Sequence, residues 1–333
     1  MIDLSTSTYH IGDCRSLLTQ LPDASVQLCV TSPPFWGQRD YGHPKQIGLE
    51  PTPALYIAEL VGVFREVRRV LRDDGTLWLN LGDSYAGSRS GPQGATGEMA
   101  GRAVADHRGM RSKTKGVDPK NPRVGPADNS APHRLRQRGL KPKDLVGIPW
   151  MAAFALRDDG WWLRQDIIWS KPNPLPESVS DRCTKAHEYL FLMSKDKNYY
   201  YNGDAIAEPA TWRGQNRNDT GPAPTAVPGA PPHRGLRAMD SAPPERRNKR
   251  SVWTVASQPY DGAHFAPFPP RLIEPCILAC SRPGDLVLDP FFGSGTVGLV
   301  AEKHGRRWVG FDLGYEQLAK ERTAQRSLLL EER

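Results

Sequence analysis

The stretch Leu286-Val-Leu-Asp-Pro-Phe-Phe-Gly-Ser-Gly-Thr296 decides the fold of this chain. A short apolar run ends in an acid, Asp289, and a loop with two glycines leads into an apolar pattern of helical spacing from Val297. This pattern is typical of a strand-to-helix turn at the carboxyl edge of a parallel sheet, where the glycines let the backbone approach a ligand. The helix start also offers unpaired N–H groups. The stretch therefore predicts an α/β fold with a cofactor bound at this turn.

A second apolar run that ends in an acid narrows the choice of cofactor. Trp308-Val-Gly-Phe-Asp312 places a carboxylate about 20 positions after Asp289, the offset at which dinucleotide folds bind ribose hydroxyls. The stretch Phe292-Gly-Ser-Gly-Thr-Val-Gly298 lacks the G-x-G-x-x-G fingerprint for a pyrophosphate. A nucleoside without a pyrophosphate therefore fits better than a nicotinamide dinucleotide, and an oxidoreductase on the same fold class is the less favoured alternative.

Composition excludes several classes of protein. The 333 residues include five scattered cysteines without a C-x-x-C pair, which favours reduced thiols in the cytoplasm over a disulfide framework or a metal site. We find no N-terminal apolar signal and no run of about 18 apolar residues, so neither secretion nor a membrane span is expected.

Positive charge is concentrated in one segment. Residues 85–143 hold 13 Lys or Arg side chains against four acids, so this segment is more positive than the whole chain, whose net charge is +7. The segment is rich in Gly and Pro and has no hydrophobic periodicity. A second stretch, residues 214–244, has the same two properties. A basic segment in an otherwise slightly acidic chain favours a polyanionic partner.

Another strand runs directly into a stiff turn. Val26-Gln-Leu-Cys-Val30 is followed by Thr31-Ser-Pro-Pro-Phe-Trp36, whose two prolines hold an extended backbone and expose a hydroxyl and an aromatic ring. Helices are expected over 52–72, 146–156 and 315–330, and strands over 76–81, 161–170 and 187–193.

With these pieces placed, the sequence resembles the DNA amino-methyltransferases that use S-adenosylmethionine (AdoMet). Asp289-Pro-Phe-Phe-Gly-Ser-Gly-Thr296 is similar to their AdoMet-binding turn and Ser32-Pro-Pro-Phe35 to their catalytic loop, and this order resembles the beta-type arrangement of the family. The resemblance covers residues 9–83, 145–203 and 248–330. It implies a Rossmann-like fold with a seven-stranded, mostly parallel sheet, a reversed hairpin, helices on both faces and inserted recognition segments.

The resemblance also implies the cofactor site. Asp13, beside Cys14, is expected at the adenine amino group and Asp312 at the ribose hydroxyls, while Gly293 and Gly295 allow close approach. The other residues implied to bind AdoMet are Phe265, Phe268, Asp289, Phe291, Ser294 and Thr296.

Methylation of an exocyclic amine is a demanding reaction because the nitrogen lone pair is delocalised into the base. Hydrogen-bond acceptors aimed at the amino protons strengthen as charge develops on nitrogen. The Ser32 hydroxyl and the Pro33 carbonyl are the expected acceptors, and Pro34 stiffens the loop. Phe35 is expected to stack on a base flipped out of the duplex. Asp83 is predicted to accept a proton behind Ser32, and its alternative role is a turn acid that caps a backbone.

The target base is predicted from the first residue of the catalytic loop. In the family a serine there is typical of cytosine-N4 enzymes, and Asp or Asn of adenine-N6 enzymes, with exceptions. We predict cytosine N4, with adenine N6 as the alternative. A non-catalytic DNA-binding protein on a methyltransferase fold is a more remote alternative, because the loop and both acids are intact.

Five segments follow from the motifs and the composition. Residues 1–83 and 145–203 are expected to form the catalytic half and 251–333 the AdoMet-binding half. The 84–144 insert is expected to contact double-stranded DNA, and the 204–250 insert to serve in target recognition. The implied setting is a prokaryotic or phage-encoded, nucleoid-associated cytoplasmic enzyme with a companion restriction endonuclease. The expected phosphate contacts are Arg134, Arg136, Arg138, Arg246, Arg247, Lys249 and Arg250.

Overall fold

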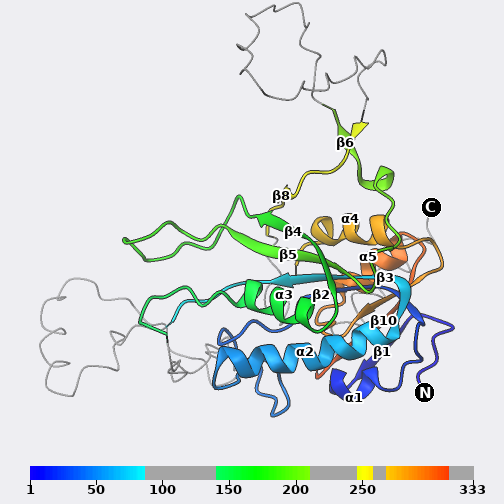
Figure 1. The fold of residues 1–333 in the computed structure, drawn as a ribbon, viewed down its shortest axis with the longest axis horizontal. Helices are drawn as coiled ribbons and strands as arrows, with labels where there is room; N and C mark the ends of the chain where they lie inside the picture. The colour runs from blue at the N-terminus through cyan, green and yellow to red at the C-terminus, as the bar shows by residue number, and fades with distance from the viewer. Residues whose placement is uncertain (87–139, 211–245, 258–267, 315–333) are drawn as a thin grey trace, which may run out of the picture.

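The computed structural model describes residues 1–86, 140–210, 246–257 and 268–314 (Figure 1). Their centre is an eight-stranded sheet with the order β1-β10-β9-β2-β3-β5-β4-β8. Among these strands only β5 runs against its neighbours, so the predicted mostly parallel sheet with a reversed strand is confirmed. The strands are β1 (Thr8–Ile11), β2 (Val26–Thr31), β3 (Leu71–Leu81), β4 (Trp162–Ser170), β5 (His187–Ser194), β8 (Val252–Thr254), β9 (Leu286–Asp289) and β10 (Arg307–Asp312).

The count of eight strands differs from the seven expected. The additional strand is β8, a three-residue edge strand that pairs in parallel with the end of β4. Its short length and mostly exposed side chains give no periodic pattern in the sequence, which is why it was missed. The expected helix over 315–330 lies outside the described residues.

Helices cover both faces of the sheet. On one face lie α1 (Cys14–Leu18), α2 (Pro53–Val70) and α3 (Ile148–Asp158), and on the other lie α4 (Pro270–Cys280) and α5 (Thr296–Lys303) (Figure 1). Alternate residues of the central strands feed the two cores, so in β3 the side chains of Leu77 and Leu79 pack on the first face and that of Trp78 on the second. None of the described helices is long and apolar enough to cross a membrane.

A smaller unit stands apart from the sheet. The two-residue strands β6 (Glu208–Pro209) and β7 (Arg246–Arg247) pair with each other next to the short helix η1 (Asp204–Ile206) (Figure 1).

The longest helix shows how the sequence fixes an element. The Thr52 hydroxyl caps α2 by accepting from the Leu55 N–H at 3.3 Å, and Pro53 occupies the first turn, where no N–H is needed. Tyr56, Leu60 and Phe64 are buried on one face of α2, in the spacing of an amphipathic helix.

The two halves of the chain meet at β2 and β9. These neighbouring parallel strands come from opposite ends of the sequence, and β3 and β10 flank them. Their carboxyl ends therefore lie at one edge of the sheet, the position at which open α/β sheets bind ligands.

Candidate active site

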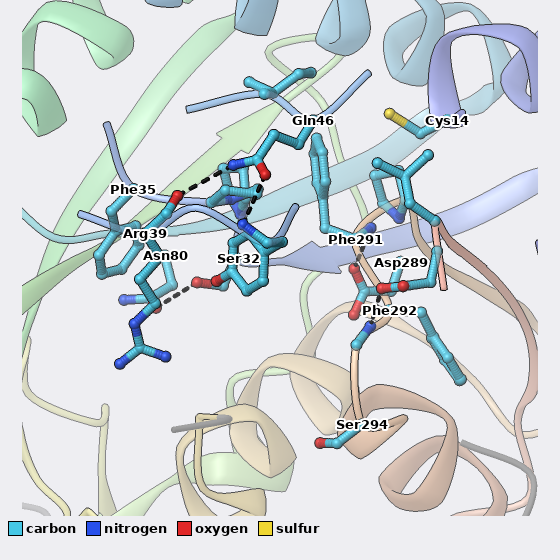
Figure 2. Close-up of a pocket in the computed structure, with 18 of the residues that line it drawn as sticks. Cys14, Ser32, Phe35, Arg39, Gln46, Asn80, Asp289, Phe291, Phe292 and Ser294 are labelled. Atoms are coloured by element: carbon cyan, nitrogen blue, oxygen red, sulfur yellow. Dashed lines mark hydrogen bonds between the residues drawn. The ribbon is translucent and has the colours of Figure 1, made fainter. Parts of the chain in front are cut away.

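A pocket of about 620 Å³ opens at this edge (Figure 2). Ser32 after β2 and Gly293 in the turn after β9 both line it, although they come from opposite ends of the chain. The other residues predicted from the sequence that line the pocket are Asp13, Cys14, Pro33, Pro34, Phe35, Phe268, Asp289, Phe291, Ser294, Thr296 and Asp312.

Asp289 is the buried acid of the pocket. Its Oδ1 accepts a hydrogen bond from the Thr31 hydroxyl at 2.6 Å and another from the Phe291 N–H at 3.0 Å. Burial raises the pKa of this carboxyl to about 7, against the two hydrogen bonds, which lower it, and the nearby Asp312 also raises it. A carboxyl group of this kind is suited to meet a cationic ligand, because a positive charge would favour its ionised form.

The turn from β9 to α5 is held by a second acid. Oδ2 of Asp312, at the end of β10, accepts from the Gly293 N–H at 2.9 Å, and Oδ1 accepts from the Gly314 N–H at 3.0 Å. Gly293 and Gly295 have φ values of 50° and 77°, which favour glycine. Gly295 is the N-cap of α5 and is not among the residues that line the pocket.

The two aromatic residues of the turn have different positions. Both rings line the pocket (Figure 2), but Phe292 is also buried and stacks on Trp308 with ring centroids 4.7 Å apart. A Cβ at Gly310 would lie 2.3 Å from the Phe292 ring, so this glycine makes room for it. Phe292 therefore anchors the turn and, like Phe291, borders the ligand space.

Asp13 is already engaged by a neighbouring cation. Its carboxylate caps α1 by accepting from the Arg15 N–H at 3.0 Å, and it also accepts from the Arg15 guanidinium at 2.9 Å. Arg15 in turn pairs with Glu59 at 2.7 Å. Asp13 lines the pocket, but Arg15 limits the directions in which its carboxylate accepts from a ligand.

Contacts with the protein core fix the position of the double-proline loop, Ser32–Phe35. The buried Tyr56 hydroxyl of α2 donates to the Pro34 carbonyl at 2.9 Å. The Phe35 ring lies over Gly82, where a Cβ would be 2.5 Å from the ring. The Gln46 side chain ties the next part of the loop, since its Nε2 donates to the Arg39 carbonyl at 3.1 Å and its Oε1 accepts from the Tyr41 N–H at 2.7 Å (Figure 2).

Ser32 is hydrogen-bonded to an amide that sequence reasoning missed. Its Oγ donates to Oδ1 of Asn80 at 3.0 Å (Figure 2). Nδ2 of Asn80 donates to Glu188 Oε2 and to the Tyr189 carbonyl, each at 3.1 Å. Asn80 is 2% exposed within the apolar run Leu77–Leu81. The sequence did contain a signal for Asn80, because an amide inside an apolar strand is expected to be buried and a buried amide needs hydrogen-bond partners.

Asp83 lies away from Ser32 and has another role. Its carboxylate accepts from the backbone N–H groups of Gly147 and Ile148 at 3.0 Å, at the start of α3, and from the Ser84 N–H at 2.9 Å. It is not among the residues that line the pocket. This geometry fits the alternative role of Asp83, an acid that caps the start of a helix. The prediction that Asp83 accepts a proton from Ser32 is wrong, because Asn80 is the hydrogen-bond partner of Ser32.

The predicted phosphate contacts are only partly described. Arg247 and Arg250 pair with Glu208 at 3.2 and 2.6 Å, and Arg246 donates to the Ala207 carbonyl at 2.9 Å. Lys249 lies 5.1 Å from the centre of the Trp253 ring. None of these four side chains lines the pocket. Phe265, Arg134, Arg136 and Arg138 lie outside the described residues.

Comparison with known proteins identifies the family of the chain. The family described as DNA methylase, of the N6 and N4 type, matches residues 26–321. The chain is 44% identical over 315 residues to type II methyltransferase M.Cfr9I of Citrobacter freundii, covering 95% of this chain and 86% of that protein. It is 46% identical over 321 residues to type II methyltransferase M.XycI of Xanthomonas campestris pv. cyanopsidis, covering 96% and 88%.

Solved structures share the fold. PvuII DNA methyltransferase (cytosine-N4-specific) matches with a TM-score of 0.57 and 20% identity over 94% of this chain and 84% of that one. A putative DNA modification methylase of Thermus thermophilus, complexed with S-adenosyl-L-methionine, matches with a TM-score of 0.55 and 24% identity, covering 96% and 93%. The methyltransferase fold expected from the sequence is thus confirmed, and the chain belongs to the N6/N4 DNA methylase family as an AdoMet-dependent type II DNA methyltransferase.

Proposed function

We propose that this enzyme methylates the N4 amine of a cytosine that is flipped out of double-stranded DNA. The observation that carries the proposal is the shared pocket, in which the Ser32 hydroxyl and the Gly293 turn face one space of about 620 Å³. A transferable methyl group and an acceptor for amino protons can therefore meet in one place.

The described residues fit AdoMet. The cofactor supplies an electrophilic methyl group on a positively charged sulfonium. The buried Asp289 carboxyl, whose raised pKa reflects missing solvation, gains most from a cation beside it. All three residues line the pocket: Gly293 is proposed to let the backbone approach the ligand, Phe291 to offer an apolar face to the adenosyl group, and Asp312 to accept from the ribose hydroxyls.

Ser32 is the proposed acceptor for one amino proton of the target base. Its own proton is directed to Asn80, so the lone pairs of Oγ are available to the substrate. The Pro33 carbonyl is the proposed second acceptor. Together they pull the nitrogen toward tetrahedral geometry and stabilise the charge that forms as the methyl group arrives. Phe35, which lines the same pocket, is proposed to stack on the flipped base.

The choice of cytosine N4 is supported by the serine at the start of the loop. It is tested by incubating the protein with AdoMet and duplex DNA and analysing the digested nucleosides by mass spectrometry. N4-methylcytosine is the expected product, and N6-methyladenine as the sole product would overturn the choice of base while leaving the methyltransferase intact.

DNA is proposed to reach the pocket across a basic rim. Arg39 and Lys45 line the pocket, and the 84–144 insert carries further positive charge, most of it outside the described residues. Binding should therefore weaken steeply with salt. Because its relatives are type II methyltransferases, we also propose a companion restriction endonuclease that cleaves the same site when it is unmethylated. Restriction of unmodified DNA in cells that carry the neighbouring genes would test this.

A further inference from the structure

Ser32 is the first member of a chain of four polar side chains that line the pocket. Ser32 donates to Asn80 on β3, Asn80 donates to Glu188 on β5, and Lys171, directly after β4, donates to Oε1 of Glu188. The strands β3, β5 and β4 are consecutive in the sheet. The side chains of Glu188 and Lys171 are only 16% and 20% exposed.

The direction of every hydrogen bond in this chain follows from chemistry. Nδ2 of Asn80 faces a carboxylate oxygen of Glu188 and the Tyr189 carbonyl, and both groups only accept hydrogen bonds. The amide must therefore place its NH₂ group on that side and its Oδ1 toward Ser32. Because Oδ1 is also only an acceptor, the Ser32 hydroxyl must donate to it.

We propose that Glu188, held by Lys171, is a positioning residue that fixes the polarity of Ser32 for methyl transfer. With its proton committed to Asn80, Ser32 presents only lone pairs to the pocket, and the target amine is recognised as a donor. This inference rests on the proposed function and adds to it the origin of the orientation of Ser32.

These four side chains polarise the serine but do not carry a proton away, so the cationic nitrogen formed by methyl transfer releases its proton to water. An amide is a very weak base, so Asn80 cannot accept the Ser32 proton and release another to Glu188 at neutral pH. The negative charge of Glu188, which accepts from the NH₂ group of Asn80, instead pushes electron density toward Oδ1 of Asn80 and strengthens the bond to Ser32. The positive charge that develops on the methylated nitrogen is thereby stabilised by preorganised dipoles.

Lys171 fixes the direction of the hydrogen bonds that run from Ser32 through Asn80 to Glu188. Its ammonium group requires an acceptor at Oε1 of residue 188, and it also lies 4.2 Å from the centre of the Trp169 ring. In a Glu188→Gln variant, Lys171 would keep the new amide oxygen for itself, so the new NH₂ group would point at the NH₂ group of Asn80. The Asn80 amide would then lose a partner or turn its NH₂ group toward Ser32.

A double-mutant cycle with Ser32 tests the proposal. Single-turnover methyl transfer to duplex DNA is measured for the full-length wild type, Glu188→Gln, Ser32→Ala and the double variant, with AdoMet and DNA affinities measured in parallel. We expect Glu188→Gln to lower the rate by about 10- to 100-fold, the size of a lost charge-assisted hydrogen bond, with both affinities unchanged. In the Ser32→Ala background the same change should alter the rate by less than about twofold, because Glu188 acts through Ser32.

Two further variants complete the experiment. Glu274→Gln breaks another Glu–Lys pair, on α4 outside the pocket, and should leave the rate unchanged. Lys171→Met removes the last side chain of the hydrogen-bonded series from Ser32 to Lys171. It takes the place of Glu188→Gln in the cycle if the Glu188→Gln protein does not fold.

The outcomes separate the two proposals. Rate losses that multiply in the double variant, or a Glu188→Gln rate equal to that of the wild type, would overturn the role of Glu188. A wild type that binds AdoMet and leaves cytosine unmodified would refute the proposed function instead.

Discussion

Thr31 and Asp289 are 258 positions apart and share a hydrogen bond of 2.6 Å. They end the adjacent strands β2 and β9, so this bond joins the half of the chain that carries the Ser-Pro-Pro-Phe loop to the half that carries the glycine turn. Asp289 is 2% exposed, and this burial is the main reason why its pKa is raised.

AdoMet binding should depend on the ionisation of Asp289. The pKa of this carboxyl is raised to about 7, so it loses its charge as the pH falls through 7 and attracts a cation less. We expect calorimetric AdoMet affinity to fall by about tenfold between pH 8 and pH 5.5 in the wild type, the effect of one lost charge interaction. Asp289→Asn should bind weakly at both pH values.

The ligand-free protein should show the opposite trend in stability. Because the folded pKa of Asp289 lies above its ordinary value of 3.8, the folded state holds a proton that the unfolded state releases between about pH 4 and pH 7. The wild type therefore loses stability as the pH rises through this window, and Asp289→Asn does not. The Tm of Asp289→Asn minus the Tm of the wild type should therefore increase from pH 4 to pH 8. Asp159→Asn, which breaks an ion pair with Arg65 outside the pocket, controls for the loss of a carboxylate, and an equal increase in that variant would contradict the prediction.

Ser32→Ala should lower the rate of methyl transfer by about 10²–10³-fold, the usual effect of removing one preorganised hydrogen-bonding group at a reacting centre. AdoMet affinity should stay within about twofold of the wild type, because the AdoMet turn does not contain Ser32. Rapid-quench transfer of a labelled methyl group measures the first quantity and calorimetry the second. A full rate in Ser32→Ala would exclude the hydroxyl as an acceptor.

Gly82→Ala should displace the proposed stacking ring. The added methyl group would lie 2.5 Å from Phe35, so the ring must leave its position over Gly82. Stacking on a base contributes about 1–3 kcal/mol, and kcat/KM for DNA should fall by about 5- to 100-fold while AdoMet affinity is retained. A base-analogue fluorescence assay for the flipped nucleotide gives an independent measurement.

Gly62→Ala is the matched control for Gly82→Ala. Nothing lies within 4 Å of the added methyl group, and Gly62 is within α2. This variant should gain about 0.5–1 kcal/mol of stability and keep full activity. Equal losses of activity in both glycine variants would show that the Phe35 position is not the cause.

Tyr56→Phe should loosen the double-proline corner. It removes the hydroxyl that donates to the buried side of the Pro34 carbonyl at 2.9 Å, and an unpaired carbonyl there costs about 1–3 kcal/mol in urea unfolding. We expect the methylation rate to fall about tenfold without a change in AdoMet affinity. An unaltered rate together with the predicted loss of stability would show that Tyr56 supports only the fold.

Deleting residues 90–138 should remove most of the salt-dependent DNA affinity and retain AdoMet binding. The deleted stretch carries most of the excess positive charge of the chain. Filter binding across a salt series measures the slope of affinity against salt, which should become shallower in the deletion variant. An unchanged slope would place the DNA contacts elsewhere.

The sequence predicted the elements of the sheet because their patterns are local. The apolar run of β9, its terminal Asp289 and the glycine turn are contiguous, and the rule that carboxyl ends of parallel strands share an edge then brings Ser32 toward Gly293. The helix α2 followed directly from its amphipathic spacing and its cap.

The partners within the site were harder to predict because they depend on register between distant strands. Asp83 and Asn80 lie three positions apart on the same strand end, and only the structure shows which one faces Ser32. The contact of Asn80 with Glu188 depends on the antiparallel pairing of β3 with β5, in which Leu81 lies opposite Tyr189. A one-residue slip would have turned these side chains to opposite faces.

The pairing of β1 with β10 also governs how the molecule is made. Thr8–Ile11 is synthesised long before its partner strand Arg307–Asp312, so its hydrogen-bonding edge waits until that strand has left the ribosome. The block formed by β2, β3, β5 and β4 has all its own pairings before that point. Nascent chains stalled before residue 307 should therefore hold that block without a complete nucleoside pocket, and we expect them to bind AdoMet only after β10 has been translated.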